Sequence, residues 1–511
     1  MEQTPLTQNT QNWKQKTVAR LLEKNILVDA EFLEQLGEED LQKIADTLAE
    51  SDFGGELFVL NAETHLQFLQ RFEEQHPEQQ QSWQQPVVER HRHKGAVNIT
   101  FSYEEKSKKR ETQDFVSFFN ARYNKMRKLL THRPELQGII SINRISGKHQ
   151  REHVSIIGMI NDIRTTKNNN LVLQVEDNTG SVKVLVSQHK PELWQKAKDI
   201  VLDEVIGVQG TTGENILFAN ALVLPDIPNT KELRKASEEA YAVFLSDLHV
   251  GSKLFLEEEF HKFLKWINQE AGNERQREIA AKVQYVFVAG DLVDGIGIYP
   301  SQEHELAIKD IYAQYAKCAE LLSHVPQEIQ LILSPGNHDA MRISEPQPRL
   351  YKDFAKPLWE LPNVTMISNP GMVNIHATGT SPGFDVLVYH GYSFDHYIAT
   401  MDSIRSHGGY DRPDIIMKLL LQKRHLAPTH TSTLYIPDAH DDPLVIDRVP
   451  DFFITGHLHK SAVANYKNIT LICSSCWQAK TAFQAKMGHN PEPARVPIAN
   501  LKTREVKLLR F

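Results

Sequence analysis

Five short apolar runs, each followed at once by side chains that can bind a metal ion, limit most strongly how this chain can fold. They stand, in order from residue 241, in AVFLSDLHVGS, YVFVAGDLVDG, IQLILSPGNHDA, VLVYHGYS and FFITGHLHKS. Stretches with helical spacing, such as 257–270 and 303–323, separate them. Apolar runs that alternate with helices indicate buried strands of an α/β sheet, whose ligands sit beyond the carboxyl ends of the strands. The sequence therefore predicts an α/β domain with a site at one edge of its sheet.

The side chains after these runs form a set of metal-capable donors. The set is Asp247, His249, Asp291, Asn337, His390, His457 and His459. Oxygen and nitrogen donors without thiolate favour manganese, iron or zinc over soft metals. Seven donors are too many for one tetrahedral ion but suit two ions that share a carboxylate, and we expect Asp291 to be the shared one. Gly290 and Gly336 each precede a donor and would let the backbone turn tightly there.

A single histidine near an apolar run is more often a hydrogen-bonded core residue than a ligand, but five clusters in order favour a common site. Side chains two apart in a strand point the same way, so His457 and His459 should do so if extended geometry persists past Gly456. Asp294 and Asp395 could either orient ligands or cap turns. The histidines without such a setting are interpreted as surface or structural residues: His91, His93, His376, His425, His430 and His440.

Length and composition limit the classes of protein to which this chain can belong. A chain of 511 residues that is 41% hydrophobic exceeds the usual size of one core, so two or more domains are expected. No apolar run approaches the roughly 18 residues that span a bilayer, and the first residues lack the apolar stretch of a secretory signal, which predicts a cytoplasmic protein without a membrane partner. Cys473 and Cys476 form a C-x-x-C, but no second pair completes a zinc site, so they are interpreted as buried strand residues.

Charge is distributed unevenly along the N-terminal part. Residues 1–87 hold 6 lysines and arginines against 16 acidic residues, whereas residues 88–152 hold 15 against 7. Helical spacing over 11–73 predicts a small acidic all-α module within residues 1–73. A glutamine- and proline-rich stretch, residues 74–95, cannot build a core and is predicted to be a flexible linker. A basic helical connector is expected over 96–150.

Within this connector, one amphipathic helix is predicted from Thr112 to just before Pro134. Aromatic and basic residues alternate along it: Phe115, Phe118, Phe119, Arg122, Tyr123, Lys125, Arg127 and Lys128. Such interleaving could hold single-stranded nucleic acid by phosphate contact and base stacking. A packed helix with solvated basic flanks is an equal alternative.

From about Val154 the apolar period changes to two, which is typical of strands. Four turn residues, 177–180, join two of these strands as a hairpin. Five short strands with a helix after the third match the small Greek-key barrel called the OB-fold, expected here over 151–228. Such a barrel can bind single strands or dock a protein, and its residues do not decide between the two.

The motifs D-x-H, G-D-x-x-D, G-N-H-D, H-G and G-H-x-H, in this order over roughly residues 240–480, resemble those of the calcineurin-like metallophosphoesterase superfamily. An OB-fold ahead of them narrows the resemblance to the small subunits of archaeal family-D DNA polymerases, which also covers DFVSFFNARYNKMRKLLTHRPEL and MGHNPEPARVPIANLKT. The implied fold is a calcineurin-like α/β domain, residues 238–511, preceded by the OB-fold and the N-terminal module.

The resemblance implies a 3′–5′ exonuclease that proofreads beside a large polymerase subunit and acts on single-stranded or mismatched DNA 3′ ends. One metal would be held by Asp247, His249, Asp291 and His459, and the other by Asp291, Asn337, His390 and His457. Two divalent ions are implied, with Mn²⁺ favoured and Fe, Zn and Mg left open. His338, which follows a ligand but is assigned to no metal, is expected to be the catalytic residue that donates a proton or hydrogen bond to the phosphate.

Two other functions stay open at this point. The chain could be a scaffold subunit that binds the large polymerase chain without hydrolysis, or a generic metallophosphodiesterase.

The terminal segment REVKLLRF vaguely resembles a sliding-clamp peptide, with Leu508 and Phe511 three apart. A terminal strand is the favoured interpretation because the usual glutamine and second aromatic residue are missing.

Overall fold

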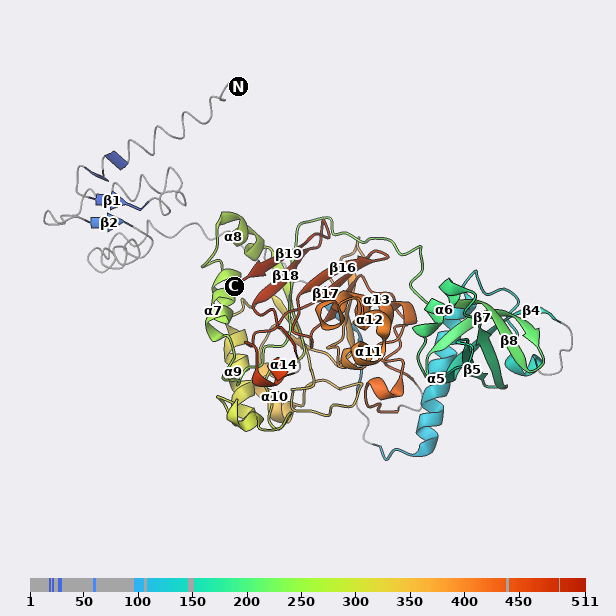
Figure 1. The fold of residues 1–511 in the computed structure, drawn as a ribbon. Helices are drawn as coiled ribbons and strands as arrows, with labels where there is room; N and C mark the ends of the chain where they lie inside the picture. Colours follow the sequence, from blue (N-terminus) through green and yellow to red (C-terminus); the bar gives the residue numbers. More distant parts are fainter. Residues whose placement is uncertain are drawn as a thin grey trace, which may run out of the picture. The chain divides into compact units, whose positions relative to one another are not determined.

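The structure is a computed structural model, and Figure 1 shows its fold. It describes residues 18–19, 21–22, 26–29, 58–60, 96–104, 108–145, 151–437, 441–486 and 488–511. The chain divides into two compact units, Met1–Val87 and Val88–Phe511, and each is described by itself. No helix among the described residues is both long and apolar enough to cross a membrane.

The N-terminal unit contains two short strands, which the prediction of an all-α module over residues 1–73 did not include. Strand β1 (Ile26–Val28) pairs in parallel with β2 (Phe58–Leu60). Runs of three apolar residues are too short to show a period of two, so they merge into the helical spacing around them. The predicted linker, residues 74–95, lies outside the described residues.

A closed five-stranded barrel follows in the second unit, which confirms the predicted OB-fold. Its elements are β4 (His153–Thr165), β5 (Leu171–Asp177), β6 (Gly180–Val186), α6 (Pro191–Lys198), β7 (Val205–Gly213) and β8 (Ile216–Val223). The strands close in the order β4-β5-β6-β8-β7, with the helix after the third strand as predicted. At the hairpin, Asp177 Oδ1 accepts hydrogen bonds from the backbone N–H groups of Thr179 and Gly180.

The remaining elements form two six-stranded sheets that pack face to face. The first sheet has the order β12-β11-β10-β9-β18-β19 and the second β16-β17-β15-β14-β13-β3. The strands of the first are β9 (Tyr241–Leu245), β10 (Val283–Ala289), β11 (Gln330–Ser334), β12 (Val364–Met366), β18 (Arg495–Asn500) and β19 (Val506–Arg510). Those of the second are β3 (Val97–Ser102), β13 (Gly371–Ile375), β14 (Phe384–Val388), β15 (Phe452–Thr455), β16 (Ala462–Tyr466) and β17 (Ile469–Cys473).

Helices cover the outer face of each sheet, so this domain has four layers (Figure 1). The first sheet packs with α7 (Glu257–Ile267), α8 (Glu274–Ala281), α9 (Ile311–Ser323) and α10 (Lys352–Trp359). The second packs with α11 (Phe394–Thr400), α12 (Asp402–Arg405) and α13 (Pro413–Lys423). A core between the sheets includes buried Phe244, Phe287 and Phe452. Short elements complete the described chain: η2 (Ile142–Arg144), η3 (Gln302–His304), η4 (Gly409–Asp411), η5 (His430–Ser432) and α14 (Ala482–Lys486).

The C-terminal strand is part of this domain. Strand β19 pairs antiparallel with β18, as the favoured interpretation of the terminal segment predicts. The ring of Phe511 packs against Phe263 and Trp266, at centroid distances of 5.6 and 5.8 Å. Phe511 therefore helps to close the core on the helical side of the first sheet, and the sliding-clamp interpretation gains no support.

The expected basic connector contributes both a strand and a helix. Strand β3 pairs antiparallel with β13 and forms one edge of the second sheet, which the sequence did not indicate. Helix α5 (Thr112–Thr131) ends before Pro134, as predicted. Phe118 and Tyr123 on this helix are buried, so they cannot stack on nucleic-acid bases. Of the two alternatives for the helix, the structure shows the packed one.

Buried ion pairs fix helix α5 and the barrel to the two-sheet domain. The fully buried Arg122 donates from Nε to Asp442 Oδ2 at 2.6 Å and from Nη1 to the carbonyl oxygens of Pro428 and Asp203, at 2.7 and 3.3 Å. Asp203 belongs to the barrel region and Asp442 to the two-sheet domain. Removing one partner of a buried pair costs about 3–5 kcal/mol, because the other charge is left unpaired.

His425 joins this network as a neutral, structural histidine. Its Nδ1 accepts from the N–H of Ala427 at 3.0 Å, so its Nε2 carries the proton and donates to Asp442 Oδ2 at 2.9 Å. Burial, and next to it the Arg122 guanidinium, lower the pKa of His425 to about 4. The interpretation of this residue as structural is confirmed, whereas His91, His93 and His440 lie outside the described residues.

His425 should make the stability of the fold depend on pH. An unfolded chain has an ordinary histidine pKa of about 6.5, so between that pH and about 4 the unfolded state binds a proton that the folded state does not. The free energy of unfolding should therefore fall as the pH falls through this window, by up to about 1.4 kcal/mol per pH unit. Urea unfolding at pH 7.0, 6.0 and 5.0 measures this.

The control for this prediction is His425→Gln, which cannot titrate. The stability gap between the parent and His425→Gln should narrow toward pH 5. The same change at His304, whose side chain is 78% exposed, controls for the replacement of a histidine as such. A constant gap for His425→Gln would contradict the prediction.

Candidate metal centre

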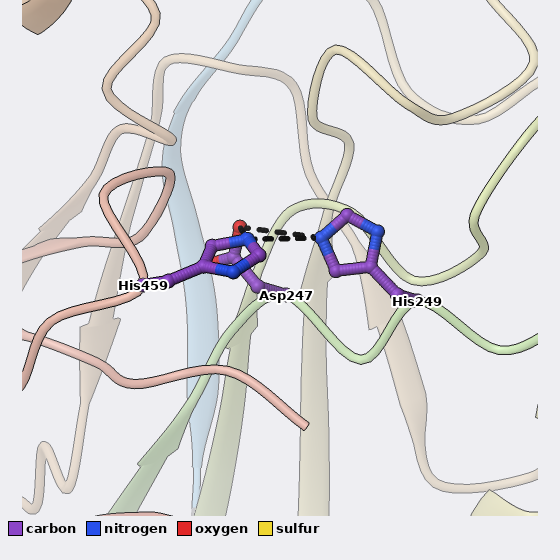
Figure 2. Close-up of side chains that lie close together, drawn as sticks. All are labelled: Asp247, His249 and His459. Atoms are coloured by element: carbon purple, nitrogen blue, oxygen red, sulfur yellow. Dashed lines mark hydrogen bonds and ion pairs between the residues drawn. The ribbon is translucent and has the colours of Figure 1, made fainter. Parts of the chain in front are cut away.

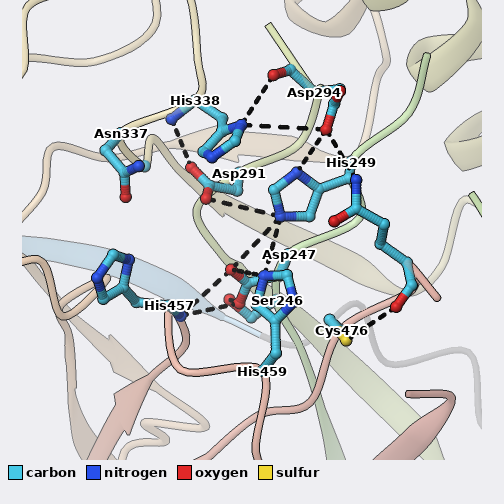
Figure 3. Close-up of polar contacts among 12 residues, drawn as sticks. Ser246, Asp247, His249, Asp291, Asp294, Asn337, His338, His457, His459 and Cys476 are labelled. Carbon is cyan, nitrogen blue, oxygen red and sulfur yellow. Dashed lines mark hydrogen bonds and ion pairs between the residues drawn. The ribbon is translucent and has the colours of Figure 1, made fainter. Parts of the chain in front are cut away.

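The seven predicted donors all lie just beyond the carboxyl ends of strands, and both sheets contribute. In the first sheet, β9, β10 and β11 end two to three residues before Asp247, Asp291 and Asn337. The turn after β9 also carries His249. In the second sheet, β14 and β15 end directly before the turns that carry the other three histidines: His390, His457 and His459. Figure 3 shows the side chains of Asp247, His249, Asp291, Asn337, His457 and His459 from these turns at one site.

Five of the seven donors have a left-handed backbone. The φ angles are 51° at Asp247, 51° at His249, 53° at Asp291, 68° at His457 and 54° at His459. Such angles are uncommon for residues with a Cβ and each costs about 1–3 kcal/mol, so they persist only where the surrounding structure imposes them. Left-handed, strained residues gather at functional sites more than elsewhere.

The condition for a shared direction of His457 and His459 is not met. Strand β15 ends at Thr455, and the extended conformation does not continue to His457 and His459. The two imidazoles therefore do not share one side as alternate strand residues would. The ring of His457 lies 5.2 Å from that of His390, and the ring of His459 lies 5.0 Å from that of His249.

One group of donors consists of Asp247, His249 and His459, shown in Figure 2. The Nε2 atoms of the two histidines are 3.1 Å apart, and His459 Nε2 is 3.3 Å from Asp247 Oδ1. All three side chains are buried. Two imidazole nitrogens and a carboxylate that converge away from water are a natural donor set for a divalent cation.

A second group surrounds Asp291 and His390. His390 Nε2 is 3.2 Å from Asp291 Oδ2 and 3.0 Å from Asn337 Oδ1. Among the described residues, Asp247, Asp291 and His390 also bring their donor atoms within 4.8 Å of one another. His457 belongs to no such three-donor group; its ring adjoins that of His390, and its Nε2 faces away from the group, toward a carboxylate.

Asp291 lies between the two groups. Its Oδ2 is 3.2 Å from His390 Nε2 on one side and 3.8 Å from His249 Nε2 on the other. Its Oδ1 accepts from the backbone N–H of His338 at 2.8 Å. This is the position that a carboxylate shared by two cations needs.

Glycines make the close approach of these turns physically possible. A Cβ on Gly336 would lie 2.2 Å from Asp291 Oδ1, and one on Gly290, whose φ is +90°, would lie 2.4 Å from His390 Nδ1. A Cβ on Gly456 would lie 2.4 Å from Asp247 Oδ2. The predicted need for glycine at 290 and 336 is therefore explained by contact with the donors themselves.

Further side chains orient the donors. Asp294 Oδ1 accepts from His249 Nδ1 at 3.1 Å, and Asp395 Oδ2 accepts from His457 Nε2 at 2.8 Å, so both predicted orienting carboxylates contact a donor histidine. Sequence reasoning missed Gln484, whose Nε2 lies 2.9 Å from His459 Nδ1. The available signal was the capping box that Gln484 forms with Thr481, because a T-x-x-Q spacing fixes both side chains.

The charges of the site are strongly coupled. Burial alone would lower the pKa of His390, but the Asp291 carboxylate raises it to about 10. Burial alone would raise the pKa of Asp291, but the positive charge of His390 holds it well below its ordinary value. Likewise Cys476 and Asp247 overcome burial and raise the pKa of His459 to about 10. Binding of a cation to these groups is therefore expected to release protons.

His338 lies beside the donors and is partly exposed to solvent. The Nδ1 of His338 must carry a proton, because its partner at 2.8 Å is the carbonyl oxygen of Asp294. Its ring lies edge-on to that of His249 at 4.6 Å, and its side chain is 17% exposed. His338 also has a donor atom within 4.8 Å of His249 and Asp291.

Cys473 and Cys476 are both buried, and neither belongs to a donor group among the described residues.

The donor set fits the two divalent cations that the family resemblance implies. Carboxylate, amide and imidazole donors are hard to intermediate, and thiolate does not take part. Glycine at 336 and 456 keeps the space beside both aspartates free of side-chain atoms. Among the described residues, the side-chain hydrogen-bond and ion-pair partners given above for these donors are aspartate, asparagine, glutamine and histidine.

Comparisons with known proteins identify the family of the chain. A family described as calcineurin-like phosphoesterase matches residues 241–461. The DNA polymerase II small subunit of Methanothermobacter thermautotrophicus is 42% identical over 402 residues, which cover 78% of this chain and 80% of that subunit. The subunits of the same name from Pyrococcus furiosus and Archaeoglobus fulgidus are both 38% identical, and the matches cover 63% and 75% of their lengths and 78% and 76% of this chain. The chain therefore belongs to the family of DNA polymerase II small subunits, and it contains a calcineurin-like phosphoesterase domain.

Proposed function

We propose that this subunit carries a 3′–5′ exonuclease that removes nucleotides from DNA 3′ ends by hydrolysis with two divalent metals. The observation that carries the proposal is the position of Asp291 between two groups of donors, 3.2 Å from His390 and 3.8 Å from His249. A lone ion would need neither the shared carboxylate nor donors on both sides of it. The name of the relatives supports a large polymerase subunit as partner.

The ligands divide between the metals according to which rings are neighbours. His459 lies beside His249 and Asp247, so these three would hold one ion together with Asp291. His457 lies beside His390, so these two would hold the other with Asn337 and Asp291. Because the Nε2 of His457 donates to Asp395, its Nδ1 is the nitrogen left for the metal.

Two divalent cations at such a site polarise a phosphodiester and make hydroxide available near neutral pH, and Mn²⁺ suits these donors. The residues of the chain place and protonate the substrate around them. The Nδ1–H of His338 is held by Asp294, so its Nε2 is the atom that can reach a phosphate oxygen or the leaving 3′-oxygen. Burial lowers the pKa of His338, and a bound phosphodiester anion would raise it again and favour the proton-donating form.

The first prediction concerns the shared carboxylate. Asp291→Asn should abolish release of nucleotides from a 3′-mismatched primer in Mn²⁺, because the amide cannot offset the repulsion of two cations. The measurement uses a 5′-labelled primer and the full chain, alone and with its copurifying partners. Asp310→Asn, at the N-cap of α9, is the matched control and should keep the parent rate. Equal rates for Asp291→Asn and the parent would contradict the proposal, and no hydrolysis by the parent with any metal would favour a scaffold subunit.

The second prediction concerns the division of the histidines. His457→Ala and His459→Ala should each lose about one metal of two while keeping the other, because their rings lie in different groups. Metal content after equilibration with Mn²⁺ and gel filtration measures this. Loss of both metals from either variant would show that the two ions do not bind separately.

The third prediction concerns His338. His338→Ala should keep both metals and lower kcat by ~10²- to 10⁴-fold, the usual contribution of a positioned acid or base. The same change at His304, whose side chain is 78% exposed, should leave kcat unaltered. Near-normal turnover would rule out the catalytic role, and loss of a metal would make His338 a ligand, which its proximity to His249 and Asp291 also permits.

A further inference from the structure

A loop with an exposed aliphatic tip lies beside His338. It runs from Asp294 to Tyr299 with the sequence DGIGIY. Gly295 and Gly297 both have a φ of +75°, so the residue between them is held by two left-handed turns. A Cβ on Gly295 would lie 2.2 Å from the carbonyl oxygen of His338, so the backbone of the loop rests directly on the His338 peptide.

Two buried glutamines clamp this loop on both sides of its tip. Gln314 accepts from the Gly295 N–H at 2.9 Å and donates to the Gly295 carbonyl at 3.1 Å. Gln302 accepts from the N–H of Ile298 at 2.9 Å and donates to the carbonyl of Asp294 at 2.8 Å. Both glutamines are fully buried. Movement of the loop would leave buried polar groups unpaired, so the loop is rigid.

The residue that the clamped loop presents is Ile296, which is 47% exposed. A single exposed aliphatic residue is ordinary on a protein surface. This one differs because its backbone is fixed and its Cα is only ~3.8 Å from that of Gly295, which touches His338. His338 itself reaches solvent, with 17% of its side chain exposed. Ile296 therefore stands on a fixed backbone two residues after Asp294, whose carbonyl oxygen accepts from His338 Nδ1 at 2.8 Å.

We propose that Ile296 packs against the nucleobase of the 3′-terminal nucleotide and so selects DNA ends whose last base is unpaired. The inference rests on the proposed exonuclease function and names its preferred substrate. Every base has an apolar face, so the contact tolerates any sequence. A base that is paired and stacked in a duplex cannot offer that face without the cost of unstacking, a few kcal/mol for a matched end and least for a mismatch.

The test measures contact with the terminal base without relying on hydrolysis. The full chain carrying Asp291→Asn is titrated with two single-stranded oligonucleotides labelled at the 5′ end, which are identical except that one ends in a 3′ abasic nucleotide. The ratio of the two dissociation constants reports the contribution of the terminal base. A third oligonucleotide with 2-aminopurine at its 3′ end reports by fluorescence whether that base is stacked.

Ile296→Ser, added to this chain, should reduce the preference for the base-bearing end by about tenfold, the order of effect for one lost apolar contact. It should also shift the 2-aminopurine fluorescence toward that of the free oligonucleotide. Ile296→Leu should keep most of the preference. The control is Ile99→Ser on β3, whose side chain is 45% exposed and whose replacement should not change the ratio.

The outcomes separate this inference from the proposed function. A ratio for Ile296→Ser within twofold of the parent, or a parent without preference for the base-bearing end, overturns the inference. If the chain with intact Asp291 shortens DNA under Mn²⁺ while the ratio ignores Ile296, only the inference fails. If that chain hydrolyses no DNA but the ratio falls with Ile296→Ser, only the proposed function fails.

Discussion

The carboxylate of Asp291 occupies the point where the two sheets of the C-terminal domain meet. One of its oxygens accepts the N–H of His338 and excludes any side chain at Gly336, while the other faces His390 from the opposite sheet. Each sheet supplies only part of the donor set, so the set is complete only while the sheets stay packed. The buried aromatic core between them, with Phe244 and Phe452, is therefore also what holds the metal centre together.

The turns at the strand ends bring the donor side chains together at the cost of backbone strain. The left-handed backbone at Asp247, Asp291 and His457 is unfavourable by itself. Each of these residues follows a buried strand, and the packing of that strand holds the turn in this conformation. The same turns aim the donor nitrogens and oxygens inward before any metal binds. Preorganisation of this kind moves part of the cost of metal binding into the folding of the domain.

The barrel and helix α5 contribute to the domain by packing. Arg122 on α5 reaches an aspartate of the two-sheet domain and a carbonyl of the barrel, and Lys423 pairs with Glu204 in the same way. Buried charges of this kind contribute little net stability but penalise any arrangement in which they are unpaired. Phe118 and Tyr123, two of the aromatic residues of α5, are used for this packing.

Much of the site follows from the sequence. Apolar runs that end in aspartate, asparagine or histidine predict both the strands and the donors, because the carboxyl ends of neighbouring strands meet at one edge. Five strands with a helix after the third predict the barrel. Among the described residues, Asp247, His249, Asp291, His390 and His459 fall into three-donor groups, whereas His457 adjoins them only through the ring of His390. These features depend on residues close together in the chain, where periodicity and turn chemistry act.

The tertiary structure decided what depends on distant residues. The different ring neighbours of His457 and His459 accompany left-handed backbone at both residues and a hydrogen bond from the His457 N–H to Asp247, and no spacing encodes that. The edge strand β3 has a partner more than 250 residues away, and Gln484 finds His459 only through the fold. Burial likewise places Phe118 and Tyr123 of α5 in the core instead of on a binding surface. Local sequence determines which groups can act, and long-range packing determines which of them face one another.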